Sequence, residues 1–305
     1  MMPIYGQIRA NRVKTFVLFF VFTLLFAGLG YLIGFFFDNP LGGVIILLVI
    51  AAVLFIISYS SGHNIIASMA GAHPVKREEE PYLYHTVESM AISAGLPTPK
   101  AYIIETDIPN AFAAGNRPDR AVVAVTRGLL NKMDRLELEG VIAHEMAHIK
   151  NYDVLAATLA VVMAGTIITI SELLLYGSRY SALSMRGGRG GRGGGAGTAV
   201  IIVLMILVAI LAPLFARLIK YSISREREYL ADATAAELTG YPEGLASALE
   251  KLSGQQVAKG PLDHKALHGL YIVNPTLGMK SKKKSRNLFS THPDSESRIT
   301  RLRKM

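Results

Sequence analysis

Two long uncharged apolar runs follow one another near the start of the chain. They cover residues 16–37 and 41–62, and only the polar sequence DNP at residues 38–40 separates them. Each run is long enough to cross the roughly 30 Å hydrocarbon core of a bilayer. The basic residues before the first run suit a signal peptide, but the run is too long and no small-residue cleavage site precedes the second run. The pattern therefore predicts a retained transmembrane hairpin over residues 1–62.

Two further apolar runs lie at residues 154–176 and 198–216, and Glu172 is the one charged residue within them. A Gly/Arg-rich loop over residues 177–197 separates these runs, and its composition predicts a flexible segment. The run lengths predict a second transmembrane pair over residues 154–216, giving four spans in all. The four arginines of the loop leave an alternative open, in which this pair is a hairpin that does not cross the membrane.

The remaining residues, 63–153 and 217–305, are predicted to form the first and second parts of one catalytic domain. Residues 101–107 and 120–126 are rich in β-branched and aromatic residues, which predicts two strands flanking a loop at 108–119. The fold class is therefore α+β, predominantly helical with a small β-sheet, joined to four transmembrane helices.

Residues 133–150 predict a helix, because Asp134 and Glu137 have the spacing of a capping box. On this helix His144 and His148 are four residues apart, so both lie on one face roughly 6 Å apart. Both can aim a ring nitrogen at one zinc ion about 2.0–2.1 Å away. Glu145 lies beside the first histidine, where a general base belongs. The apolar neighbours half-bury this site; they are Val141, Ile142, Met146 and Ile149.

A catalytic zinc site needs a third protein ligand, and residues 224–240 supply a candidate on a second helix. Glu228 can bind the metal while Asp232, four residues later, reaches a ring N–H of a ligand histidine. The alternative is an ordinary solvated face, since charged residues directly precede Glu228. The apolar residues that follow argue against a freely solvated helix; they are Tyr229, Leu230, Ala231, Ala233, Ala235 and Ala236.

Composition narrows the choice of metal site and of partners. The chain is 51% hydrophobic with a mean hydropathy of +0.35, which is too apolar for an average soluble protein. It has no cysteine, so any metal must be held by histidine and carboxylate. The net charge of +9 indicates loops against anionic lipid. Because 28 of the 32 Lys and Arg residues lie before the first run or in the two soluble segments, these parts are predicted to be cytoplasmic.

Several motifs together resemble the HtpX-type membrane zinc endopeptidases, which are gluzincins related to the CaaX prenyl proteases. The motifs are HEMAH at 144–148, EYLAD at 228–232, PNAFAAG at 109–115, VAVTRGLL at 123–130 and LFSTHPDSESRITRL at 288–302. The resemblance covers essentially the whole chain, with the Gly/Arg-rich loop as the unusual part. It implies one zinc ion per chain held by His144, His148 and Glu228, with Glu145 as the base. It also implies a multi-pass plasma-membrane protease that cleaves misfolded or damaged membrane proteins in quality control.

The resemblance gives two other stretches a role. Asn110, Ala111 and Phe112 correspond to an edge strand beside the zinc, and an edge strand can bind an extended peptide by strand addition. His292 is similar to a histidine that stabilises the developing oxyanion. Without the resemblance, an ordinary loop residue is an equally good interpretation of Asn110. The alternative for His292 is a residue at the entry to a helix, before Pro293.

Other function classes are disfavoured. The sequence GRGGRG at 188–193 follows no strand and lacks a P-loop lysine, so nucleotide binding is not predicted. The Arg-Gly repeat is short and lies between apolar runs, so nucleic acid is not predicted as a partner. A zinc-binding scaffold without turnover would have no use for Glu145, and a solute carrier would need more intramembrane charges than Glu172. The sequence therefore predicts a zinc metalloendopeptidase acting on polypeptides.

Overall fold

The structure is a computed structural model that describes residues 4–163, 165, 225–253, 267, 270–272 and 294–305. Most of the predicted second transmembrane pair, the whole Gly/Arg-rich loop and His292 lie outside these residues.

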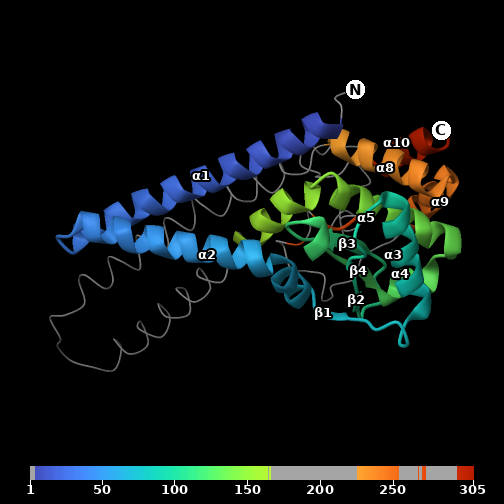
Figure 1. Cartoon of the computed structure of the whole chain (residues 1–305), viewed down its shortest axis with the longest axis horizontal. Coiled ribbons are helices and arrows are strands. Elements are labelled where there is room, and N and C mark those ends of the chain that lie inside the picture. The colour runs from blue at the N-terminus through green and yellow to red at the C-terminus, as the bar shows by residue number, and fades with distance from the viewer. Residues whose placement is uncertain (1–3, 164, 166–224, 254–266, 268–269, 273–293) are drawn as a thin grey trace, which may run out of the picture.

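A long helical hairpin begins the chain (Figure 1). Helix α1, Ile4–Phe36, and helix α2, Pro40–Met69, run antiparallel and join through the predicted polar turn. Asp38 adopts the left-handed conformation there, and the Asn39 side chain caps α2 by accepting the Gly42 N–H at 2.9 Å. The two helices contact closely where glycines meet, since a Cβ on Gly43 would lie only 2.1 Å from the Gly30 carbonyl oxygen.

The outer faces of this hairpin are apolar and exposed, as expected for a surface in contact with lipid. Within the described residues, α2 is the helix long and apolar enough to cross a membrane by length and composition. It does not end at the predicted boundary, residue 62, but continues to Met69 with Ile66 and Ala67 buried. The globular part is therefore joined to the hairpin by an unbroken helix.

The globular part contains a four-stranded mixed sheet with the order β1-β2-β4-β3. Its strands are β1, Ala72–Pro74, β2, Lys100–Ile104, β3, Ala111–Ala114, and β4, Val122–Thr126. Strands β2 and β4 are parallel, and the outer pairs are antiparallel.

The two predicted strands are confirmed as β2 and β4, with shorter bounds. The residue pattern predicted a loop at 108–119, but β3 lies within it, followed by the short 3-10 helix Pro118–Arg120. The edge strand that the family resemblance implied at this position is present. The residue pattern alone did not reveal it because three of its four residues are alanine, which has low β-propensity, and all four are buried.

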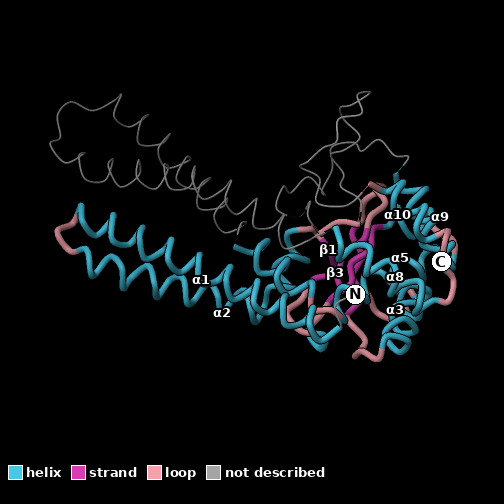
Figure 2. Tube along the Cα trace, turned by 90° about the horizontal axis from the view of Figure 1, so that it is seen from above, coloured by secondary structure: helices cyan, strands magenta, loops and turns pink. Residues whose placement is uncertain are grey.

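Helices cover both faces of the sheet (Figures 1 and 2). The labelled helices of the globular part are α3, Pro81–Ala94, α4, Arg127–Lys132, α5, Arg135–Lys150, α8, Arg225–Thr239, α9, Pro242–Ser253, and α10, Ser295–Leu302. One core lies between the sheet and α3, α5 and α9. The other core lies between the sheet, the end of α2 and the apolar helix Asp153–Met163.

Helix α5 is the central element of the globular part. Its predicted capping box is confirmed, since Glu137 N–H donates to Asp134 Oδ1 at 3.0 Å and Asp134 N–H donates to Glu137 Oε2 at 2.9 Å. The helix is buried on most sides, and a Cβ on Gly140 would lie 2.6 Å from the backbone nitrogen of Leu245 in α9. The site on this helix is therefore more deeply buried than the predicted half-burial.

Candidate metal centre

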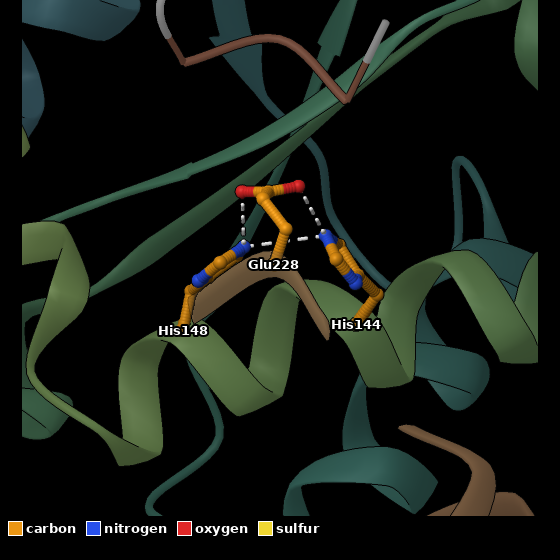
Figure 3. Close-up of side chains that lie close together, drawn as sticks. All are labelled: His144, His148 and Glu228. Atoms are coloured by element: carbon orange, nitrogen blue, oxygen red, sulfur yellow. Dashed lines mark hydrogen bonds and ion pairs between the residues drawn. The ribbon is translucent and has the colours of Figure 1, made fainter. Parts of the chain in front are cut away.

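Three side chains from two packed helices converge on one point (Figure 3). His144 and His148 come from α5 and Glu228 comes from α8. The two Nε2 atoms lie 3.2 Å apart, His148 Nε2 lies 3.5 Å from Glu228 Oε1, and His144 Nε2 lies 3.8 Å from Glu228 Oε2. Ligands held tetrahedrally at about 2.1 Å from one ion are about 3.4 Å apart, so these separations fit a single metal ion.

His144 is 1% exposed, and Asp232 on α8 fixes its ring. Its Nδ1 lies 3.1 Å from Asp232 Oδ1, which leaves Nε2 facing the other two ligands. Burial lowers the pKa of His144 to about 4; the positive charge of Arg298 adds to this effect, and the hydrogen bond to Asp232 opposes it. The imidazole is therefore neutral at pH 7, as a metal ligand must be.

His148 has a carboxylate partner, Asp153, which was not predicted from the sequence. Burial lowers the pKa of this histidine, but the hydrogen bond to Asp153 and the charge of Glu228 outweigh it and raise the pKa to about 9. The His148 Nδ1 atom lies 3.0 Å from Asp153 Oδ2. Asp153 directly follows Tyr152, which adopts a left-handed conformation in the turn after α5. The signal was available, since Asp153 is the first acid beyond the end of the motif helix.

Glu145 is 3% exposed and lies on α5 next to His144. Its negative charge contributes to the raised pKa of His148, which puts the carboxylate within electrostatic range of the cluster. Two arginines complete the surroundings: Arg227 pairs with Asp153, and Arg298 pairs with Glu228 and Asp232.

The charges of these described residues favour a cation. Four buried carboxylates and two buried guanidinium groups surround the two imidazoles, which leaves a formal charge of −2 when the histidines are neutral. A divalent metal ion would neutralise this charge, and burial of an uncompensated charge is costly. The donor set of two imidazoles and one carboxylate is typical of catalytic zinc sites.

The predicted substrate residues lie at the outer strand of the sheet, which contacts α5. Asn110, Ala111 and Phe112 are at most 2% exposed. The Asn110 side-chain oxygen accepts the Ala111 N–H at 3.0 Å, and the Ala111 carbonyl accepts the N–H of Ile272 at 3.1 Å. The start of this edge is therefore already paired within the chain, and Tyr271 packs edge-on against Phe112.

A buried helix carrying His-Glu-x-x-His, with a carboxylate from a second helix as the third candidate ligand, is the arrangement typical of a metalloprotease centre. Residues 77–305 match the model of peptidase family M48. The chain therefore belongs to peptidase family M48, and it is of the HtpX type, since its match to HtpX homologues covers 94% or more of their length. It is thus a membrane metalloprotease whose substrates are polypeptides.

The sequence relatives support this assignment, and a solved structure shares the fold. Protease HtpX homologues from Leuconostoc mesenteroides, Listeria innocua and Dictyoglomus thermophilum are 49%, 45% and 43% identical to the chain. In each case the match covers 99% of this chain, and it covers 100%, 100% and 94% of the relative. The crystal structure of S. mikatae Ste24p has a TM-score of 0.51 and 19% identity, covering 98% of this chain and 67% of that one, which shows a shared fold.

Proposed function

We propose that the chain is a zinc endopeptidase with one zinc ion held by His144, His148 and Glu228. The observation that carries this proposal is the set of three ligand separations, all close to those of a tetrahedral ion. The absence of cysteine supports a histidine and carboxylate site. Zinc at this position supplies a Lewis acid that polarises the scissile carbonyl and makes water acidic enough to attack near neutral pH.

Four residues of the protein have further roles in the proposed reaction. Glu145 acts as the general base that takes the proton of the attacking water and then delivers it to the leaving amine. Asp232 and Asp153 hold the two imidazoles in the tautomer whose Nε2 faces the metal, which their contacts of 3.1 and 3.0 Å with Nδ1 support. His292 stabilises the oxyanion, a role that follows from the family motif alone.

The substrate peptide binds by strand addition along the outer edge of β3, near Asn110, Ala111 and Phe112. In the register with β4, the backbone groups of Ala111 and Ala113 point away from β4. The Ala111 N–H is already bonded to the Asn110 side chain, so an added strand would pair at Ala113. Because the Ala111 carbonyl already pairs with Ile272, the substrate either adds beyond this point or displaces residue 272. Recognition of backbone groups gives little dependence on sequence, which suits a protease that removes damaged proteins.

The natural substrates are misfolded or damaged membrane proteins, cleaved in quality control on the cytoplasmic side of the plasma membrane. Two observations support this. The hairpin has exposed apolar faces, and α2 continues without a break into the globular part that carries the site. A peptide emerging from the bilayer next to this hairpin is therefore close to β3 and α5.

The test is proteolysis by the purified full-length protein in detergent. Zinc is removed with a chelator and then restored in stoichiometric amount, with unfolded casein as substrate. We expect cleavage to disappear with the metal and to return with zinc. A protein that binds one zinc ion per chain and leaves casein intact would be a zinc-binding scaffold, and the proposed activity would be wrong.

A further inference from the structure

One arginine from the end of the chain is buried against the metal-ligand cluster. Arg298 on α10 is 1% exposed and is the largest fully buried side chain among the described residues. Its Nη2 lies 2.6 Å from Asp232 Oδ1 and its Nε lies 2.9 Å from Asp232 Oδ2, while its Nη1 lies 3.2 Å from Glu228 Oε2. One guanidinium group thus binds the third ligand and the carboxylate that orients His144.

The geometry explains why arginine is suited to this position. Glu228 and Asp232 are one helical turn apart on α8, so their like charges repel in a buried environment. A planar guanidinium forms two parallel hydrogen bonds to one carboxylate and still has a further N–H for the second. The ammonium group of a lysine is a compact point charge and cannot reproduce this fork.

These contacts fix two properties of the ligand set. Asp232 is held where its Oδ1 lies 3.1 Å from His144 Nδ1, so the His144 Nε2 lone pair faces the metal position. Glu228 is held by its Oε2, which leaves its Oε1 directed towards His148 Nε2 at 3.5 Å. Without the guanidinium, Asp232 would lose two hydrogen bonds and Glu228 would lose an ion pair, and the two carboxylates would repel each other.

The position of Arg298 depends on docking of α10 against α8 and α9. The Ser297 and Tyr229 hydroxyls lie 3.0 Å apart, and the Arg301 guanidinium lies 3.8 Å from the centre of the Tyr229 ring. Leu302 is buried in the core, and the exposed pair of Arg303 with Glu243 of α9, at 3.0 Å, adds little to this docking. Helix α10 is thus held independently of the pairs that Arg298 makes.

We propose that Arg298 is a positioning residue of the catalytic centre, which holds Glu228 and Asp232 in the geometry needed to bind the metal. The inference rests on the proposed zinc site and adds a third helix, α10, to the two helices that carry the ligands. It requires that loss of the Arg298 fork weakens metal binding and alters the coordination geometry in a chain that remains folded.

The test measures metal binding instead of proteolysis. Full-length protein carrying Glu145→Gln, which removes the proposed general base, is titrated with Co²⁺ and with Zn²⁺ in competition against a chelator. We expect Arg298→Gln to bind both metals about 10- to 100-fold more weakly, the range found when the residues behind metal ligands are removed. We also expect the visible absorption spectrum of the Co²⁺ form to change, which a purely structural role would not cause.

The matched control is Arg303→Gln, the same substitution on the same helix. Arg303 is 43% exposed and pairs with Glu243 and Glu250, away from the ligands, so the metal affinity and the Co²⁺ spectrum should not change. If Arg298→Gln is folded and equals this control in both readouts, the inference is wrong. If Arg298→Gln does not fold, Arg298→Lys decides: weaker binding with an altered spectrum supports the inference, and parent-like binding overturns it. A parent protein that binds neither metal would refute the zinc site itself.

Discussion

His148 Nδ1 and Asp153 Oδ2 lie 3.0 Å apart across the turn that ends α5. His144 and Asp232 form a second pair of the same kind. Arg227 forms an ion pair with Asp153, and Arg298 forms one with Asp232. Both imidazoles are therefore held by a carboxylate that is itself held by a guanidinium group.

Replacing Asp153 by asparagine should weaken metal binding. The amide cannot accept the Nδ1–H as strongly as a carboxylate, so His148 becomes a poorer ligand and its ring is less well oriented. We expect the zinc dissociation constant to rise about 10- to 100-fold, as measured by competition with a fluorescent chelator. The control is Asp119→Asn, which removes an exposed aspartate paired with Arg117 and should leave the affinity unchanged.

Metal binding should release a proton at neutral pH. In the metal-free fold the pKa of His148 is about 9 and that of His144 is about 4, so at pH 7 the first is protonated and the second is neutral. Only neutral imidazole binds a metal, so about one proton leaves on binding, and the apparent affinity falls about tenfold per pH unit from 9 down to 4. Calorimetry in buffers of different ionisation enthalpy measures this release. Metal binding at pH 7 without release of a proton contradicts the prediction.

The same pKa values give the sign of the pH effect on the metal-free fold. The pKa of His148 is raised above the ordinary histidine value of 6.5, so its contribution to stability is complete below pH 6.5 and is lost as the pH rises through 9. The pKa of His144 is lowered, so its burial costs stability as the pH falls from 6.5 towards 4. Melting temperatures of the metal-free protein should therefore decline at both ends of the range.

Glu145→Gln should keep the metal and lose proteolysis. The amide preserves the shape of the side chain but cannot take a proton, and a general base contributes about 10²- to 10⁴-fold to the rate. We expect zinc content to stay at one per chain while casein cleavage falls by this factor. The control is Glu139→Gln, which changes a glutamate on the same helix that pairs with Arg135. A comparable loss of activity in this variant would contradict the assignment of Glu145 as the general base.

Asn110→Ala should impair peptide binding more than chemistry. The Asn110 side chain accepts the N–H of Ala111 at the start of the edge strand, so its loss loosens the edge on which the substrate is proposed to lie. One neutral hydrogen bond contributes about 0.5–1.5 kcal/mol, so we expect kcat/KM for a peptide to fall about 2- to 10-fold through KM. Asn116→Ala, another buried asparagine close to β3, is the control, and an equal effect on KM would contradict the prediction.

Local chemistry made part of the site predictable from sequence. The spacing of His144 and His148, the Asp134 capping box and the polar turn at residues 38–40 are all set within a few residues, and helical periodicity relates them directly. Glu228 could be proposed because its own helix is too apolar for a solvated face.

Long-range contacts account for what the residue pattern did not predict. Arg298 is 154 residues from His144, and nothing in the periodicity of α10 relates it to α5. Strand β3 consists mostly of alanine, so its place at the edge of the sheet follows from pairing with β4 and not from its own propensity. Arg227 lay within a charged run that suited a solvated face, yet it is 9% exposed because Asp153 compensates its charge.

The two soluble segments should lie on the same side of the membrane, and that side should be the cytoplasm. His144 and Glu228 lie 3.8 Å apart although one belongs to each segment, so an even number of crossings must separate them. The side follows from the 28 basic residues in the N-terminus and the two segments. Single cysteines in this cysteine-free chain test both points when intact cells are treated with a membrane-impermeant thiol reagent.

Ser89 and Glu237 are exposed positions, one in each segment, and residue 194 lies in the Gly/Arg-rich loop. We expect Gly194→Cys to react in intact cells, while Ser89→Cys and Glu237→Cys react only after the membrane is permeabilised. Protection of all three would mean that the second apolar pair does not cross, which would put the four loop arginines on the cytoplasmic side with the others. Reaction of Ser89→Cys in intact cells would reverse the orientation, and reaction of only one of Ser89→Cys and Glu237→Cys would contradict the shared metal centre, because both segments must reach the same ion.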